Sequence, residues 1–318
     1  MSAASPTPSP SADYVPQRRS GRSGLHLSAL ALGVQPNPGC RCCATTTGSL
    51  IDYAINTGVT HFDISPQLVS GSQDALRQIL IPVQAWRNEV VISTRVGLGT
   101  HPMASLGFGS RKHLLSSLDR FLHQTGLDYL DILYAHRYDR RTPMDETVGA
   151  LVSAVQQGKV LYVGLSDYAP SALGHANRLL HERGVPAIAY QTSYSLLDQW
   201  ADSDLLSTLS HLGIGVIACA PLGHAALTPG RPVADSASLN ALAQIATARG
   251  QTLPQLALSW VLRNPIVTSA LLSTTCPQHL IENISALDRT DFTPKELATL
   301  EQWGVSALAG SVNSVYSG

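Results

Sequence analysis

Long apolar runs and an excess of charge are both missing from this chain of 318 residues. No apolar stretch approaches the roughly 18 residues that a membrane span needs, and residues 1–19 lack the apolar core of a secretion signal. The formal net charge is −1, from 21 basic and 22 acidic residues, so bulk electrostatics do not favour nucleic acid or a membrane surface. We therefore expect a cytoplasmic protein with neither kind of partner.

Cysteine is scarce and irregularly spaced. Three of the five cysteines, Cys40, Cys42 and Cys43, stand together as CRCC, and Cys219 and Cys276 are isolated. The cluster could bind a metal, but no second Cys/His pair follows at ligand spacing. Free thiols in a loop are the simpler interpretation, so we expect no metal, and reduced thiols suit the cytosol.

The glycine fingerprint of doubly wound dinucleotide folds is also absent. The 25 glycines are scattered, and no GxGxxG follows an expected strand, which disfavours that fold. Lysine is rare as well, because only Lys112, Lys159 and Lys295 are lysines among the 21 basic residues. We attribute the skew to arginine to genome composition.

The chain does contain a regular alternation of strand and helix patterns. A hydrophobic fraction of 44% suits one large α/β domain, which we expect over residues 24–318, after a Ser-, Ala- and Pro-rich disordered tail at 1–23. In the clearest unit, the apolar run Leu130–His136 is followed by a helix and then by the apolar run Val160–Leu165. Eight such strands are expected near residues 29, 61, 92, 132, 163, 189, 217 and 271. Strand–helix alternation of this length predicts a single (β/α)8 TIM barrel.

The expected strands end on polar side chains that would share one mouth of the barrel. Asp63, Arg95 and His136 end three consecutive strands, and a carboxylate, a guanidinium and an imidazole could polarise a substrate or move protons. Alternatively, Asp63 and Arg95 form a buried ion pair beside a core histidine. Three such residues in succession favour the functional interpretation.

Several segments, taken together over residues 24–303, resemble the aldo-keto reductases. The similarity is greatest to the branch with potassium-channel beta subunits and bacterial glyceraldehyde-3-phosphate reductases. The resemblance implies a (β/α)8 barrel and NADPH-dependent carbonyl reduction by an Asp, Tyr, Lys and His tetrad. The segments that carry it are GLHLSALALG, THFD, VVIST, SRKHLLSSLDRFLHQTGLDYLDILYAHR, TPMDETVGALVSAVQQGKVLYVGLSDY, QTSYSLL, APLG and QLALSWVLRNPIVTSALL.

Half of the tetrad that the resemblance implies is replaced. Asp63 and His136 match the aspartate and the histidine. Leu68 stands where the family has its proton-donating tyrosine, and Arg95 stands where it has lysine. Arginine keeps the charge but effectively cannot release a proton, so the two are not equivalent. The resemblance therefore predicts a degenerate tetrad.

The implied cofactor site is also altered. Cys219 replaces the aromatic residue that the family stacks on nicotinamide, and Cys276 replaces the arginine that grips the 2′-phosphate. The stretch 222–238 is shorter than in the family. NADPH remains the implied cofactor, with its binding weakened or lost. The positions matching cofactor contacts are Ser166, Asp167, Gln191, Leu222, Ser273, Glu282 and Asn283.

Three hypotheses follow for a protein with a small-molecule partner. In the first, Asp63, Arg95 and His136 perform non-redox acid–base chemistry, such as cyclisation, dehydration or isomerisation, on a small carbonyl metabolite. His136 would transfer the proton because its pKa is expected near working pH. The second is an NAD(P)H-dependent oxidoreductase with an altered proton donor, and the third is a non-catalytic binding or scaffold protein. Relatives often form tetramers or octamers, so the resemblance also allows a homo-oligomer.

Overall fold

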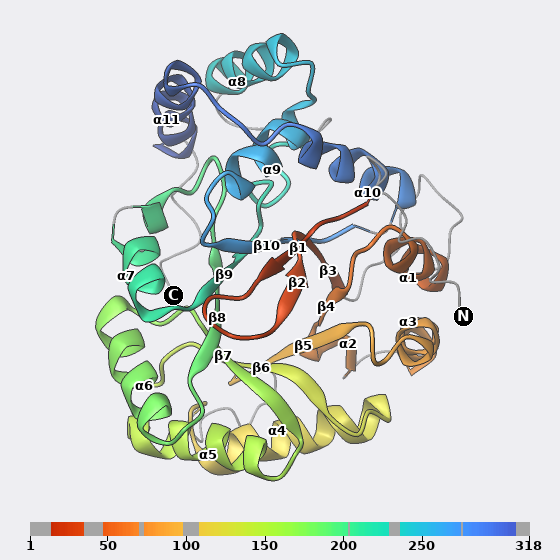
Figure 1. The fold of residues 1–318 in the computed structure, drawn as a ribbon, viewed down its shortest axis with the longest axis vertical. Coiled ribbons are helices and arrows are strands. Elements are labelled where there is room, and N and C mark those ends of the chain that lie inside the picture. The colour runs from red at the N-terminus through yellow and green to blue at the C-terminus, as the bar shows by residue number, and fades with distance from the viewer. Residues whose placement is uncertain are drawn as a thin grey trace, which may run out of the picture.

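The computed structural model describes residues 14–34, 47–69, 73–97, 108–202, 204–228, 236–274 and 276–309. Eight parallel strands close into a barrel in the order β10-β3-β4-β5-β6-β7-β8-β9 (Figure 1). The predicted (β/α)8 barrel is confirmed. The strands are β3 Leu30–Val34, β4 His61–Ile64, β5 Val91–Val96, β6 Leu130–His136, β7 Val160–Ser166, β8 Ala187–Ser193, β9 Gly215–Cys219 and β10 Val267–Leu272.

Strand β6 shows how the sequence forms the barrel. All seven of its residues are buried, because alternate side chains face the barrel interior and the surrounding helices. Ile132 and Tyr134 belong to the interior cluster, whereas Leu133 packs in the larger core beneath the helices. The register with β7 pairs His136 with Ser166, so both residues emerge at the same end of the barrel.

A ring of helices covers the outside of the barrel (Figure 1). A short helix α2, Pro66–Val69, precedes α3. Several ends follow local sequence signals: Ser110 caps α4, Gly126 ends it with φ of 67°, and Thr252 with Gln255 forms a capping box on α9. The ring comprises α1 Thr47–Asn56, α3 Gln73–Ala85, α4 Arg111–Thr125, α5 Met144–Gln156, α6 Pro170–Glu182, α7 Leu205–Leu212, α9 Leu253–Leu262 and α10 Pro277–Ile284.

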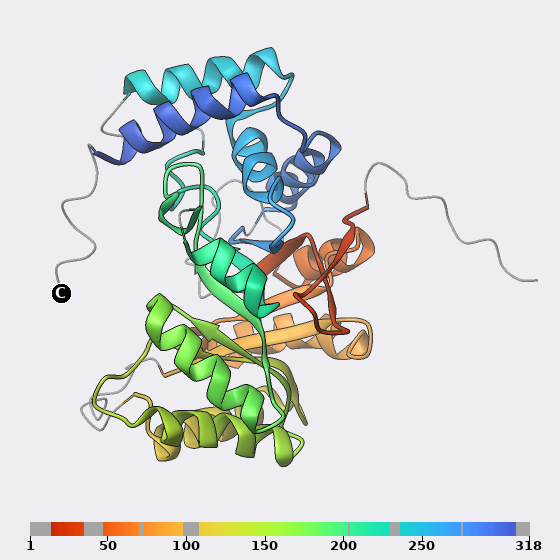
Figure 2. The same ribbon diagram turned by 60° about the vertical axis from the view of Figure 1, so that its left-hand side comes forward.

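Two further helices pack together outside this ring. They are α8, Ser236–Ala248, and α11, Pro294–Ala309, and Figure 2 shows them side by side at one end of the molecule. No helix among the described segments has the length and apolar character to cross a membrane.

A hairpin that the sequence did not reveal crosses the end of the barrel where the strands begin (Figure 1). It pairs β1, Gln17–Arg19, with β2, His26–Ser28. Arg18 Nη1 donates to the carbonyl oxygens of Leu262 and Val267, each at 3.0 Å, and Ser20 Oγ donates to Ile188 O at 2.9 Å. These bonds hold the hairpin on the barrel.

The hairpin corrects two predictions. The single strand expected near residue 29 is instead two strands, β2 and β3. Residues 14–23 belong to the fold, although they were assigned to the tail at 1–23, because their polar side chains bond to distant barrel carbonyls. Residues 1–13 and the Cys40–Cys43 loop lie outside the described residues.

Candidate active site at the barrel mouth

The predicted catalytic residues meet where β4, β5 and β6 end. Asp63 is 2% exposed, and its Oδ1 accepts a hydrogen bond from Ser93 Oγ at 2.7 Å. Its other oxygen, Oδ2, lies 3.6 Å from Arg95 Nη2 and 3.5 Å from Gln191 Nε2. The barrel therefore brings a carboxylate, a guanidinium and a primary amide together, as the strand ends predict.

His136 completes this group from the end of β6. Its Nδ1 lies 3.1 Å from Ser166 Oγ and 3.6 Å from Asp167 Oδ2. Burial, together with the positive charges of Arg95 and Arg137, lowers the pKa of His136 to about 4. The expectation of a pKa near working pH is therefore wrong. At neutral pH the imidazole is uncharged, and its contact with Asp167 is a polar contact rather than an ion pair.

Several buried polar atoms at and beneath the mouth have no hydrogen-bond partner among the described residues. They are Arg95 Nε, Gln191 Oε1, Tyr134 Oη and His61 Nδ1. Such groups are rare in native proteins because each loses its hydration without compensation. A donor and an acceptor left open beside Asp63 are therefore consistent with a site completed by a ligand.

Three residues beside the mouth have a positive φ, a backbone conformation that is rare for residues other than glycine. Arg137, Asp167 and Ala220 directly follow β6, β7 and β9 with φ of 56°, 54° and 47°. Non-glycine residues in this left-handed region cost of order 1 kcal/mol or more and cluster at functional sites. The sequence identified Asp167 but missed Arg137 as a mouth residue.

Two interior residues next to Asp63 were also missed. His61 Nε2 lies 2.9 Å from Ser93 Oγ, the hydroxyl that donates to Asp63. His61 lies two residues before Asp63 on β4, and Ser93 lies two residues before Arg95 on β5. Each therefore lies on the same interior face of its strand as a residue that the sequence predicted. The two-residue period of a strand could have found them.

The predicted cofactor residues divide into two groups. Ser166, Asp167 and Gln191 lie with the catalytic group, and Ser273 follows β10 beside Gly33, where a Cβ would lie 3.2 Å from Ser273 Oγ. The others are Leu222, in the turn after β9, and Glu282 and Asn283, on α10. Among the described residues, no hydrogen bond or ion pair joins these three to the mouth group.

The structure permits a test of how a nicotinamide cofactor would fit. Gln191 Oε1 is a buried, open acceptor that suits the amide NH2 of nicotinamide. At the start of α10, Cys276 is 7% exposed, and a neutral thiol cannot pair with a phosphate as an arginine does. Burial raises the pKa of the Cys219 thiol at the mouth, which therefore stays protonated. Gln191 therefore fits the nicotinamide end of such a cofactor, whereas Cys276 offers no positive charge to a phosphate.

Metal binding finds no support in the described segments, where no three His, Cys, Asp or Glu residues are grouped to hold an ion.

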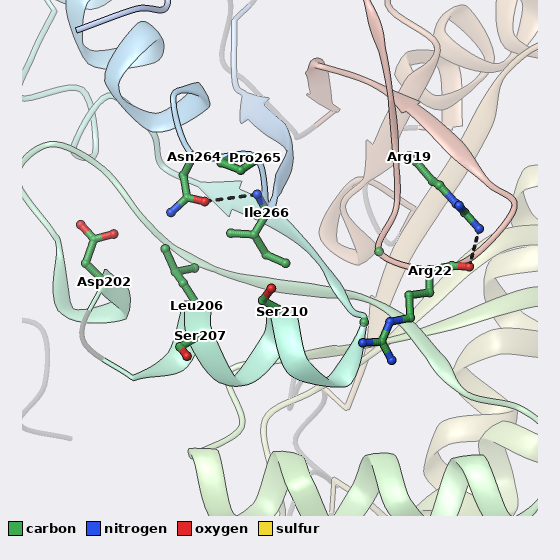
Figure 3. A pocket seen from close by; sticks show the side chains of 11 residues that line it. Arg19, Arg22, Asp202, Leu206, Ser207, Ser210, Asn264, Pro265 and Ile266 are labelled. Carbon is green, nitrogen blue, oxygen red and sulfur yellow. Dashed lines mark hydrogen bonds between the residues drawn. The ribbon is translucent and has the colours of Figure 1, made fainter. Parts of the chain in front are cut away.

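A separate groove of about 500 Å³ lies at the opposite end of the barrel. Figure 3 shows it between α7 and the loop that joins β1 to β2, with Ser207 and Ser210 on the helix and Asn264 across from them. Asn264 Oδ1 accepts a hydrogen bond from Ile266 N at 3.2 Å. This is the face of a barrel whose residues usually serve stability rather than catalysis.

Comparisons with known proteins find similar sequences and a similar fold. The sequence model of the Aldo/keto reductase family matches residues 43–304. L-glyceraldehyde 3-phosphate reductase of Escherichia coli strain K12 is 39% identical over 315 residues, covering 90% of this chain and 91% of its own. A putative voltage-gated potassium channel subunit beta of Schizosaccharomyces pombe is 30% identical over 322 residues, covering 91% and 93%. A crystal structure of a thermostable aldo-keto reductase with the inhibitor epalrestat superimposes with a TM-score of 0.75 at 25% identity, covering 90% of this chain and 99% of that one.

Proposed function

The chain belongs to the aldo/keto reductase family, and from that membership we propose that it is an NAD(P)H-dependent reductase of small carbonyl compounds. The observation that carries the proposal is the mouth group of Asp63, Arg95 and His136, with Gln191 Oε1 open beside it. The second of the three sequence hypotheses is thus preferred. A non-redox role depended on a His136 that titrates near neutral pH, and that support is lost.

We interpret Leu68 and Arg95 as replacements of the family's tyrosine and lysine. Leu68 is 3% exposed and packs in the hydrophobic core, so position 68 offers neither a hydroxyl nor a route for a proton. Another group must therefore protonate the product oxygen, and water admitted at the mouth is the donor we propose.

Arg95 takes over the electrostatic part of the reaction. A bound NAD(P)H would supply the hydride. The guanidinium of Arg95 stabilises the negative charge that develops on the carbonyl oxygen, and neutral His136 orients that oxygen through a ring N–H. A preorganised donor of this kind contributes about 3 to 4 kcal/mol to transition-state stabilisation.

We propose a phosphorylated aldehyde as the substrate. The Escherichia coli relative is an L-glyceraldehyde 3-phosphate reductase, and Arg137 lies exposed beside His136. An exposed guanidinium at the rim suits bidentate recognition of a phosphate. Because Cys276 supplies no cation, we also propose that NADH and NADPH bind with comparable affinity.

Binding and turnover test this function together. NADPH and NADH should each quench tryptophan fluorescence at micromolar concentration, and glyceraldehyde 3-phosphate should be reduced faster than glyceraldehyde. Arg137→Ala should raise the KM for the phosphorylated aldehyde and leave that for glyceraldehyde unchanged. Failure of both cofactors to bind would contradict the proposal, and equal use of the two aldehydes would contradict the phosphate site.

A further inference from the structure

Asp63 is the last member of a hydrogen-bond chain that extends from the barrel interior to the mouth. His61 Nε2 lies 2.9 Å from Ser93 Oγ, and Ser93 Oγ lies 2.7 Å from Asp63 Oδ1. None of the three side chains is more than 2% exposed. Strand pairing fixes the arrangement, because Asp63 on β4 is the register partner of Ser93 on β5.

The direction of the chain follows from which atoms carry protons. Ser93 Oγ donates its one hydroxyl proton to Asp63 Oδ1, because a carboxylate oxygen is an acceptor. Ser93 Oγ must then accept from His61, which places the ring proton on Nε2. His61 Nδ1 remains an unprotonated acceptor with no partner among the described residues. Burial lowers the pKa of His61 to about 4, against a raising effect of Asp63, which agrees with a neutral ring of this tautomer.

Among the side chains that the structure describes around Asp63, Ser93 makes the shortest contact. Arg95 and Gln191 approach Oδ2 only to 3.6 Å and 3.5 Å, distances at which hydrogen bonds are weak. The orientation of the carboxylate is therefore set by Ser93, and the position of Arg95 depends on that orientation.

We propose that His61 and Ser93 are positioning residues of the active site, which hold Asp63, and through it Arg95, in the orientation that carbonyl reduction requires. The role rests on the reductase function proposed above and adds two residues to it. Neither residue touches the substrate, and both act through the Asp63 carboxylate.

Ser93→Ala tests the role against a matched control. We expect kcat to fall about 10-fold or more and KM to change less than about 2-fold. The control is Ser269→Ala, a buried barrel serine on β10 whose Oγ has no partner among the described residues, and its turnover should match that of the wild type. A kcat of Ser93→Ala equal to that of the control would overturn the proposal.

Two His61 variants separate hydrogen bonding from packing. His61→Gln keeps a donor near the Nε2 position and should recover most of the turnover that His61→Leu loses. Equal turnover by the two variants would show that the hydrogen bond from His61 has no effect on catalysis and would contradict the proposed role.

Ring nitrogen NMR of the full-length protein reports on the chain without any turnover. A neutral Nε2–H tautomer of His61 is expected, and an Nδ1–H tautomer would overturn the chain. If the wild type reduces no carbonyl compound, the proposed reductase function is wrong. The tautomer of His61 still shows whether the hydrogen-bond chain from His61 to Asp63 is present.

Discussion

At the residue scale, the mouth contains one cation, Arg95, whose hydrogen-bonding capacity is not fully used by its neighbours. Arg95 lies 3.6 Å from Asp63 Oδ2, is 25% exposed, and keeps Nε without a partner among the described residues. This guanidinium therefore keeps a donor open for charge that forms on a substrate. Its permanent charge also means that it cannot act as the proton donor.

Removing that cation should abolish most of the activity. Arg95→Met is expected to lower kcat about 100-fold or more, because the developing oxyanion loses its charged donor and Asp63 is left buried without its cation. Arg95→Lys should retain more turnover, since it keeps the charge. Steady-state reduction of glyceraldehyde 3-phosphate measures both, and a Met variant as active as the Lys variant would contradict this role.

The buried histidines should make stability depend on pH. The folded-state pKa values of His61 and His136 are both lowered to about 4 from an ordinary 6.5, so between these values the unfolded chain binds protons that the native chain does not. Stability is then fully present above pH 6.5 and is lost as pH falls toward 4, by on the order of 3 kcal/mol for His61.

Urea unfolding between pH 7 and pH 4 measures this dependence. His61→Gln should flatten the curve in that window because its side chain does not titrate. An unchanged slope in the variant would show that His61 is not the group responsible.

Sequence patterns predicted Asp63, Arg95 and His136 because strand ends in a barrel share one mouth. They could not give the pKa of His136, because burial and the charges of Arg95 and Arg137 depend on the folded arrangement. His61 and Ser93 were missed because interior residues below a mouth resemble ordinary buried strand residues.

At the element scale, the hairpin β1–β2 is the part of the fold that closes the other end of the barrel. Its turn fits tightly, because Arg22 N donates to Gly213 O at 2.8 Å and Gly21 has φ of +54°. A Cβ on Gly21 would lie 2.0 Å from Gly213 O. The turn therefore admits no side chain at this position without moving the backbone.

Two glycines of this turn give a matched pair of substitutions. Gly21→Ala should lower the free energy of unfolding by about 2 kcal/mol or more, through backbone strain and the clash with Gly213. Gly24→Ala meets nothing within 4 Å and should change it by less than about 0.5 kcal/mol. Denaturant unfolding measures both, and equal stability of the two variants would contradict the tight closure.

The strands and helices of the barrel were predictable, because their runs are long enough to show a period of two or 3.6. The hairpin was not, since its strands have three residues each and its anchors lie far away, as in the bond from Arg18 to Val267 O. Composition instead suggested a tail.

At the scale of the whole molecule, the two ends of the barrel carry different features. The hairpin closes the end where strands begin, and Asp63, Arg95 and His136 gather at the other. Family membership could be inferred from the sequence, because the matching segments run in order through most of the chain. Whether the chain transfers hydride could not be inferred, since that depends on how the residues at the mouth act together.

Deuterium transfer shows whether the protein moves a hydride from the cofactor to a carbonyl. The purified protein is incubated with NADPH deuterated at the transferable C4 position and with glyceraldehyde 3-phosphate, and the mass of the product is measured by mass spectrometry. We expect an alcohol product that carries one deuterium at the former carbonyl carbon. A product of the same oxidation level as the substrate, without deuterium, would contradict it and restore the non-redox alternative.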